Sequence, residues 1–390
     1  MSAGGHIAIL ELETEEASVV TITELAERAG FRVSLYLSPA IRERVLPALQ
    51  QRDRVVHDVE GGPESGRLQR VLAELDADPP DLVVLPRFVA RSQEDLDRFR
   101  ELARRFRVCV GIFNYKRWLP AWPPLFVSAF PYVSPAQVRD WRRCRSMLGA
   151  FHCFFVSEIE RGSRNPLKVR LREITGRQVF DLPFKLAERT ATPPFDHAAP
   201  RFIIPGKIQR KRRDYLGVLR YFERPDVVTT AWTLVLLGKP DGLYGRHVLS
   251  RARRINRRAG ADKVVFFDSY VSQQTFDEEM ARATHILAPL NPREYEFGKD
   301  SGAIYDVFKY GKIGVFNERY FDGACGVVRD GVIRYRSQSD LYRVFGDVIA
   351  GRVDYASLKA AWPGLQDYLD VDRYVAYAGA ELRAAAGAPR

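Results

Sequence analysis

Short apolar runs alternate with amphipathic stretches through the first half of the chain. Runs such as His6–Leu10 and Asp81–Pro86 have the length of buried strands, and the stretches between such runs carry apolar residues at helical spacing. This alternation predicts βαβ units and a parallel sheet. The expected strands are residues 6–10, 32–37, 54–59, 81–86, 108–114, 153–157 and 178–183. The expected helices are residues 18–30, 39–50, 66–75, 92–106 and 136–149.

A Pro-rich segment interrupts this pattern. Residues 188–200 contain three prolines and no apolar period, which is typical of a linker. The alternation then restarts. We expect strands at residues 201–204, 233–237, 263–267, 285–289 and 312–316. We expect helices at residues 214–222, 244–258, 272–283 and 301–310, and three more at 337–350, 355–362 and 368–386.

The pattern predicts an α/β protein with two Rossmann-like, doubly wound domains. Its 390 residues exceed what one ordinary core holds. We expect an N-terminal domain at residues 1–190, a linker at 191–200 and a C-terminal domain at 201–350. Residues 351–390 are expected to form helices that pack back on the N-terminal domain. Two such domains facing each other leave a crevice at the carboxyl ends of their strands, where ligands bind in open α/β sheets.

Composition narrows the class of protein. The net charge is +11, and the basic excess is densest at Lys207–Arg213 and Arg246–Arg258. Such clusters bind nucleic acid, anionic lipid or phosphorylated ligands, or they form solvated helix faces. No apolar run reaches the roughly 18 residues of a membrane span, and Met1–His6 lacks signal-peptide features. The four cysteines show no metal-binding spacing, so we expect a cytoplasmic protein in a reducing compartment.

Three segments at predicted strand ends carry candidate chemistry. Gly206 and the cations that follow it suit a diphosphate, because glycine permits close approach and Lys or Arg neutralises charge. Cations repel the positive N-terminus of a helix, and a bound anion would remove that penalty. Lys239 follows the next strand and is suited to a leaving phosphate. Tyr270 and Val271 follow the third strand and are expected to contact a base by stacking and by backbone groups.

The segment Glu296–Phe316 is an acidic loop that opens into a helix and passes into a strand. Free backbone N–H groups at a helix N-terminus favour a phosphate. The carboxylates of Glu296 and Asp306 are suited to accept hydrogen bonds from sugar hydroxyls. N–H groups that bind phosphate, beside carboxylates that bind sugar hydroxyls, indicate a nucleotide-sugar ligand.

With these residues, the second half resembles the donor domain of GT-B glycosyltransferases, particularly the retaining family four, over roughly residues 200–320. Gly206-Lys207 and Arg212 look like the family's Gly-Arg and later Lys, which hold the donor diphosphate. Asp306, five residues before Gly311, matches the family's second carboxylate, which holds the ribose. The first carboxylate departs from the family spacing: Glu296 lies ten residues before Asp306, and Glu294 is the alternative.

The resemblance implies a glycosyltransferase that uses a UDP- or GDP-sugar, retains anomeric configuration and needs no metal or other cofactor. Its implied catalytic residues are Glu296, Lys207 and Arg212. The implied donor-binding residues are Gly206, Lys239, Tyr270, Val271, Lys299, Asp300, Ser301, Gly302 and Asp306. The acceptor would be a glycan, a lipid-linked molecule or a small molecule. A role in polysaccharide biosynthesis, with peripheral contact on the inner face of the membrane, belongs to the same expectation.

Two other functions remain open on the sequence. A nucleotide-sugar epimerase shares the architecture, although no acid/base set of carboxylates or histidines stands out. A non-catalytic protein could use the basic clusters to bind polyanions. The sequence contains no P-loop and no Gly-x-Gly-x-x-Gly, which argues against a standard dinucleotide site. We expect no nucleic-acid partner.

Overall fold

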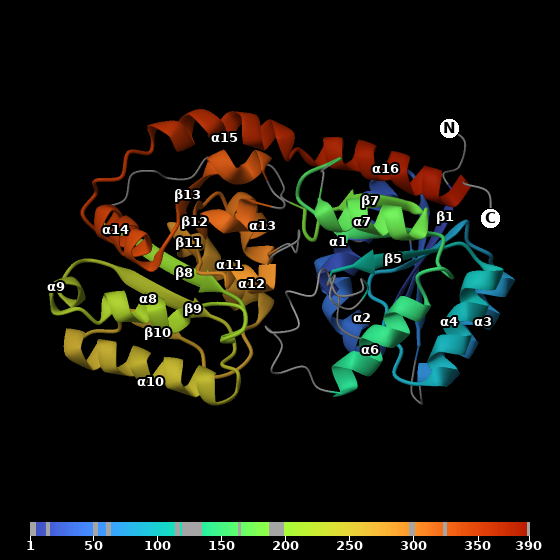
Figure 1. Cartoon of the computed structure of the whole chain (residues 1–390), viewed down its shortest axis with the longest axis horizontal. Helices are drawn as coiled ribbons and strands as arrows, with labels where there is room; N and C mark the ends of the chain where they lie inside the picture. Colours follow the sequence, from blue (N-terminus) through green and yellow to red (C-terminus); the bar gives the residue numbers. More distant parts are fainter. Residues whose placement is uncertain are drawn as a thin grey trace. The chain divides into compact units, whose positions relative to one another are not determined.

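The chain folds into two compact α/β units (Figure 1). The computed structural model describes residues 5–12, 16–49, 54–59, 64–113, 118, 135–162, 165–186, 199–295, 301–322 and 326–387. The first unit holds the described residues up to Lys185 together with those from Val371 onward, and the second holds those between Leu186 and Asp370. The C-terminal segment therefore returns to the unit that contains the N-terminus.

A parallel sheet of seven strands forms the centre of the first unit, in the order β3-β2-β1-β4-β5-β6-β7. The strand order reverses at β1, as in doubly wound folds. The predicted strands all form, within a few residues of their predicted ends. They are β1 (His6–Glu11), β2 (Arg32–Leu37), β3 (Val55–Asp58), β4 (Leu82–Leu85), β5 (Val108–Ile112), β6 (Cys153–Ser157) and β7 (Gln178–Leu182).

Helices cover both faces of this sheet. Apolar side chains of α3, α4 and α6 pack on one face in a continuous core, while α1 contacts the C-terminal helix α16. Helix α4 begins with a capping box in which Ser92 and Asp95 each bind the other's backbone N–H. The helices are α1 (Glu16–Arg28), α2 (Pro39–Val45), the 3-10 turn η1 (Leu46–Ala48), α3 (Glu64–Ala77), α4 (Gln93–Arg105), α6 (Pro135–Ser146), α7 (Pro166–Thr175) and α16 (Val371–Gly387).

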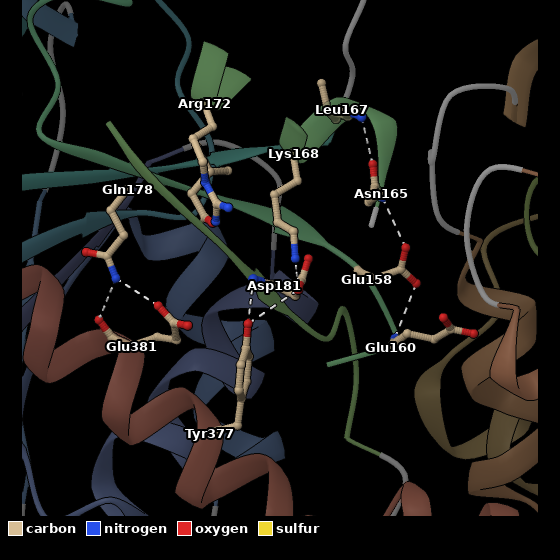
Figure 2. A network of polar contacts seen from close by, with 11 residues as sticks. Glu158, Glu160, Asn165, Leu167, Lys168, Arg172, Gln178, Asp181, Tyr377 and Glu381 are labelled. Atoms are coloured by element: carbon tan, nitrogen blue, oxygen red, sulfur yellow. Dashed lines mark hydrogen bonds and ion pairs between the residues drawn. The ribbon is translucent and has the colours of Figure 1, made fainter. Parts of the chain in front are cut away.

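A buried ion pair lies where α16 meets the first sheet (Figure 2). Lys168 Nζ on α7 lies 2.6 Å from Asp181 Oδ2 on β7, and both side chains are buried. The hydroxyl of Tyr377, on α16, donates to the same carboxylate oxygen at 3.3 Å. A second contact joins Gln178 Nε2 to Glu381 Oε2 at 2.8 Å. These bonds hold the last helix of the chain against the first sheet.

The second unit is built on six parallel strands in the order β10-β9-β8-β11-β12-β13. The order reverses at β8, so this sheet too is doubly wound, and the two sheets confirm the predicted α/β fold class. The strands are β8 (Arg201–Pro205), β9 (Thr233–Leu237), β10 (Val264–Phe266), β11 (His285–Ala288), β12 (Ile313–Asn317) and β13 (Val332–Tyr335). Strand β13 was not predicted from the sequence.

Side chains of α8, α10 and α14 form one apolar core with the second sheet. On α15, Trp362 stacks on Phe308 of α13 with ring centroids 5.3 Å apart, so α15 packs within the second unit. The helices are α8 (Tyr215–Phe222), α9 (Pro225–Val228), α10 (Gly242–Ala259), α11 (Gln273–Arg282), α12 (Pro292–Tyr295), α13 (Gly302–Lys309), α14 (Gln338–Ile349) and α15 (Ala356–Tyr368), with 3-10 turns η3 (Glu318–Phe321) and η4 (Val327–Gly331). Within the described residues, no helix combines the length and apolarity of a membrane span.

The Lys168–Asp181 pair gives a test of the α16 anchor. Lys168→Met leaves Asp181 buried without its cation, and removing one partner of a buried pair costs about 3–5 kcal/mol. We expect differential scanning calorimetry to show a clearly lower melting temperature for this variant. Lys168→Met/Asp181→Leu removes both charges and should recover part of the loss. The control is Lys359→Met, at an exposed position of α15. A melting temperature of Lys168→Met equal to that of the control would contradict the anchor.

Candidate functional site

The carboxyl ends of β8, β9 and β11 meet through a segment that we call the basic loop, Gly206–Arg213. On one side, the N–H of Ile208 donates to the carbonyl of Lys239 at 3.0 Å, after β9. On the other side, the N–H of Asn291, after β11, donates to the carbonyl of Arg212 at 2.9 Å. The basic loop is therefore held between the loops of both neighbouring strands, at the edge where ligands bind in sheets of this kind.

Two glycines bring the loops after β8 and β9 into close contact. A Cβ added to Gly238 would lie 2.2 Å from the carbonyl oxygen of Gly206, so only glycine fits at position 238 without movement of the backbone. Gly206 has a φ of +98°, which side-chain-bearing residues rarely adopt. The buried hydroxyl of Tyr215 donates to the carbonyl of Gly206 at 2.9 Å, and burial raises the pKa of Tyr215 to about 12.

Exposed cations crowd this edge. Lys207 lies 2.7 Å from Asp241, and its hydrogen bond is the main cause that lowers the pKa of Asp241. Lys211 lies 3.5 Å from Glu294. In the part of the chain that the structure describes, Arg212 and Lys239 form no ion pair with a carboxylate, although the charge of Lys239 also helps to lower the pKa of Asp241. Their charge is available to an anion.

Four of the predicted site residues thus come together: Gly206, Lys207, Arg212 and Lys239. Tyr270 and Val271 follow β10, the edge strand beside β9, and Tyr270 is 73% exposed. Such an exposed ring is free to stack on a ligand. The three predicted residues Glu296, Lys299 and Asp300 lie outside the described residues.

The remaining predicted residues belong to the start of α13. Ser301 is buried and caps the helix: its hydroxyl accepts from the N–H of Ala303 at 3.4 Å, and its own N–H donates to the Tyr320 hydroxyl at 3.1 Å. Gly302 is the first helical residue, and Asp306 lies one turn further on with 3% of its surface exposed. Glu294, the alternative first carboxylate, is buried beside Lys211.

A cavity of about 770 Å³ opens on the β11–β13 side of the same edge. Its wall contains five arginines from the basic loop, α8 and the ends of β12 and β13: Arg210, Arg213, Arg220, Arg319 and Arg336. None of the predicted site residues lines it. Sequence reasoning identified Arg210 and Arg213 only as members of a basic cluster. It missed Arg336 because β13 was not recognised, and it missed Arg319, in the turn after β12, because that residue belongs to no basic cluster in the sequence.

The described residues contain no group of three or more His, Cys, Asp or Glu side chains placed to hold a metal ion.

No family model matches the sequence, and it matches no curated protein. Solved structures do match, over almost the whole length of the chain. All of those described below share less than 15% of their residues with it.

One match is Anabaena HepE in complex with UDP and glucose, with 13% identity, a TM-score of 0.61, and coverage of 97% of this chain and 100% of that chain. Another is the α,α-trehalose 6-phosphate synthase of Burkholderia multivorans, with 12% identity, a TM-score of 0.57 and 99% coverage of both chains. A third is described as a UDP-N-acetylglucosamine 2-epimerase from Listeria monocytogenes, with 13% identity, a TM-score of 0.57, and coverage of 98% and 96%. At these identities the likeness shows the fold alone, and it confirms the GT-B type of fold that the sequence predicted.

The contact between Gly238 and Gly206 generates a prediction. Gly238→Ala forces a methyl group against the Gly206 carbonyl and should lower stability by about 1–3 kcal/mol, the usual cost of overpacking. Urea unfolding, with the second unit monitored by hydrogen exchange, measures this loss of stability. Gly66→Ala is the control, since a Cβ there meets nothing within 4 Å. Equal stability of the two variants would mean that the two loops do not approach as described.

Proposed function

We propose that the protein is a glycosyltransferase that moves a sugar from a nucleoside-diphosphate sugar to an acceptor. The observation that carries the proposal is the basic loop, whose cations outnumber their carboxylate partners and are held by glycine-permitted contacts at the carboxyl edge of a doubly wound sheet. The fold supports it, because the chain matches a structure holding UDP and glucose over nearly its whole length. The charge balance supports it as well, because Arg212 and Lys239 lack carboxylate partners among the described residues.

In the proposed reaction, the bond from the anomeric carbon to the diphosphate oxygen breaks and the acceptor oxygen bonds to that carbon. Negative charge develops on the departing diphosphate while the sugar gains oxocarbenium character. Lys207, Arg212 and Lys239 neutralise that charge from the basic loop and its neighbour. The acceptor proton passes to the leaving phosphate, so no separate enzymic base is required. The proposal includes retention of anomeric configuration and independence of a metal. Both rest only on the sequence resemblance to the retaining GT-B glycosyltransferases.

Two carboxylates complete the proposed donor site. Asp306 is assigned to the ribose and Glu296 to the sugar. In support, Asp306 lies one turn inside α13, whose first residue follows Ser301 directly. Lys299, Asp300, Ser301 and Gly302 would present backbone N–H groups to the distal phosphate. The N–H of Ser301 donates to the Tyr320 hydroxyl and would have to exchange that partner for the phosphate.

An epimerase is the second candidate, because one matched structure is described as a UDP-N-acetylglucosamine 2-epimerase. Product analysis separates the two. A transferase releases the nucleoside diphosphate only when an acceptor is present, whereas an epimerase converts the nucleotide-sugar into an isomer of equal mass without one. Incubation with UDP- and GDP-sugars, followed by NMR and mass spectrometry, tests this. If the protein binds every polyanion equally and converts no nucleotide-sugar, both candidates are wrong.

Lys239→Ala tests whether the cations at the carboxyl edge of the second sheet bind the donor. A hydrogen bond to a charged group contributes about 1.5–3 kcal/mol, so we expect at least about tenfold weaker binding of UDP or GDP. Because Lys239 is assigned to the phosphates, pyrophosphate binding should weaken as well. Isothermal titration calorimetry measures both affinities, with Lys359→Ala as the control. Unchanged nucleotide affinity in Lys239→Ala would remove this lysine from the site.

Asp306→Asn tests the ribose assignment. Asparagine keeps the shape of this buried side chain, so the fold should persist while the charged acceptor is lost. We expect UDP or GDP to bind about tenfold more weakly and pyrophosphate to bind as before, since pyrophosphate has no ribose. Asp226→Asn, at an exposed position in α9, is the matched control. A parallel loss of pyrophosphate binding would show that Asp306 supports the fold of the loop and not the ribose.

A further inference from the structure

We infer that the arginine-lined cavity beside the basic loop is a second anion site, which binds a small phosphate-bearing ligand other than the donor nucleotide. The cavity measures about 770 Å³, which lies in the usual range for small-molecule pockets. We call it the arginine cavity. It belongs wholly to the second unit, and its walls come from the β8 loop, α8, α10, α14 and the ends of β11, β12 and β13.

Charge is the first reason for this assignment. Of the five arginines in the wall, Arg336 is paired with Glu318, a carboxylate that also lies near Arg329 and Arg334. The other four pair with no carboxylate among the described residues, and Asp214 is the single acid in the wall. Like charges gathered in one concavity raise the local concentration of anions and are stabilised by binding one.

Unsatisfied buried donors are the second reason, and they are independent of the charge count. Arg213 is 94% buried, and its Nε has no hydrogen-bond partner. Nε2 of Gln338, at the start of α14, is also buried and without a partner. Buried donors without an acceptor cost free energy, so their presence in one cavity wall points to an acceptor that the ligand supplies.

The helix ends in the wall do not explain the site by themselves. Asp214 accepts the N–H of Gly217 at 2.9 Å at the start of α8, and Ser337 accepts the N–H of Asp340 at 3.1 Å at the start of α14. Both helices are therefore capped by their own side chains. The planar guanidinium groups are the groups suited to phosphate, because they bind its oxygens in a bidentate manner.

The arginine cavity is distinct from the proposed donor site. None of the residues proposed to bind the donor lines the cavity: Lys207 and Lys239 belong to the loops after β8 and β9, and Asp306 lies on α13, after β11. Arg213 is placed between the two: a Cβ on Gly206 would lie 3.1 Å from its Nη1. Leu216, Leu290 and Leu341 add apolar surface, which suits a phosphate ester better than a bare ion.

Titration calorimetry with inorganic phosphate and with glycerol 3-phosphate tests the inference on the full chain. We expect saturable binding of at least one of them, weakened at least about tenfold in Arg220→Gln and in Arg319→Gln, whose side chains are exposed. Arg258→Gln, at an exposed position in the last turn of α10, is the matched control and should bind as the wild type does. Tighter binding of glycerol 3-phosphate identifies an ester, and equal binding identifies free phosphate.

Several outcomes would overturn the inference. These are no saturable binding of either probe, unchanged binding in Arg220→Gln and Arg319→Gln, or an equal loss in Arg258→Gln. Phosphate binding should also persist in Lys239→Ala and in the presence of saturating UDP. Competition by UDP would show that phosphate binds at the donor site, which would contradict a second site. Failure of the donor proposal alone would leave UDP binding in Lys239→Ala unchanged, with the phosphate results intact.

Discussion

Repulsion among the cations at the carboxyl edge of the second sheet is the constraint on which the functional account depends. The basic loop places Lys207, Arg210, Lys211 and Arg212 at the surface within a few residues, and Lys239 lies on the adjacent loop. Two carboxylates, Asp241 and Glu294, offset part of this charge. The remainder is fixed in place by backbone hydrogen bonds to both neighbouring loops. Such an edge is stabilised when an anion binds.

The backbone makes this concentration of charge possible. Gly206 and Gly238 allow the loops after β8 and β9 to touch. The hydroxyl of Tyr215 donates a hydrogen bond to the carbonyl of Gly206 and so fixes the loop after β8. Arg213 then lies against Gly206 with its Nε unsatisfied and reaches the arginine cavity. The two proposed ligand regions therefore share one loop, and a change of loop conformation would affect both.

Much of the fold could be predicted from the sequence, because parallel strands buried on both faces leave continuous apolar runs between amphipathic helices. The exceptions have physical reasons. Strand β13 is only four residues long and contains Arg334, so its run is too short and too polar to recognise. The helix expected to end at Trp362 continues through Pro363 to Tyr368, and the break comes at Leu369 and Asp370. Helix α7 is short and contains three basic residues, so its apolar positions were not recognised as one face of a helix.

The candidate site was predictable only where its residues are close in sequence. The cluster Lys207–Arg213 is visible in the chain, whereas Arg319 and Arg336 reach the cavity through strands whose order cannot be read from sequence alone. The buried nitrogens of Arg213 and Gln338 lack a hydrogen-bond partner because of how the side chains pack, and no sequence pattern predicts this.

The most direct test of the account is a crystal structure of the protein with a bound nucleoside diphosphate. The account predicts diphosphate density within hydrogen-bond distance of Lys239 and the basic loop. Diphosphate density away from the carboxyl edge of the second sheet would contradict it.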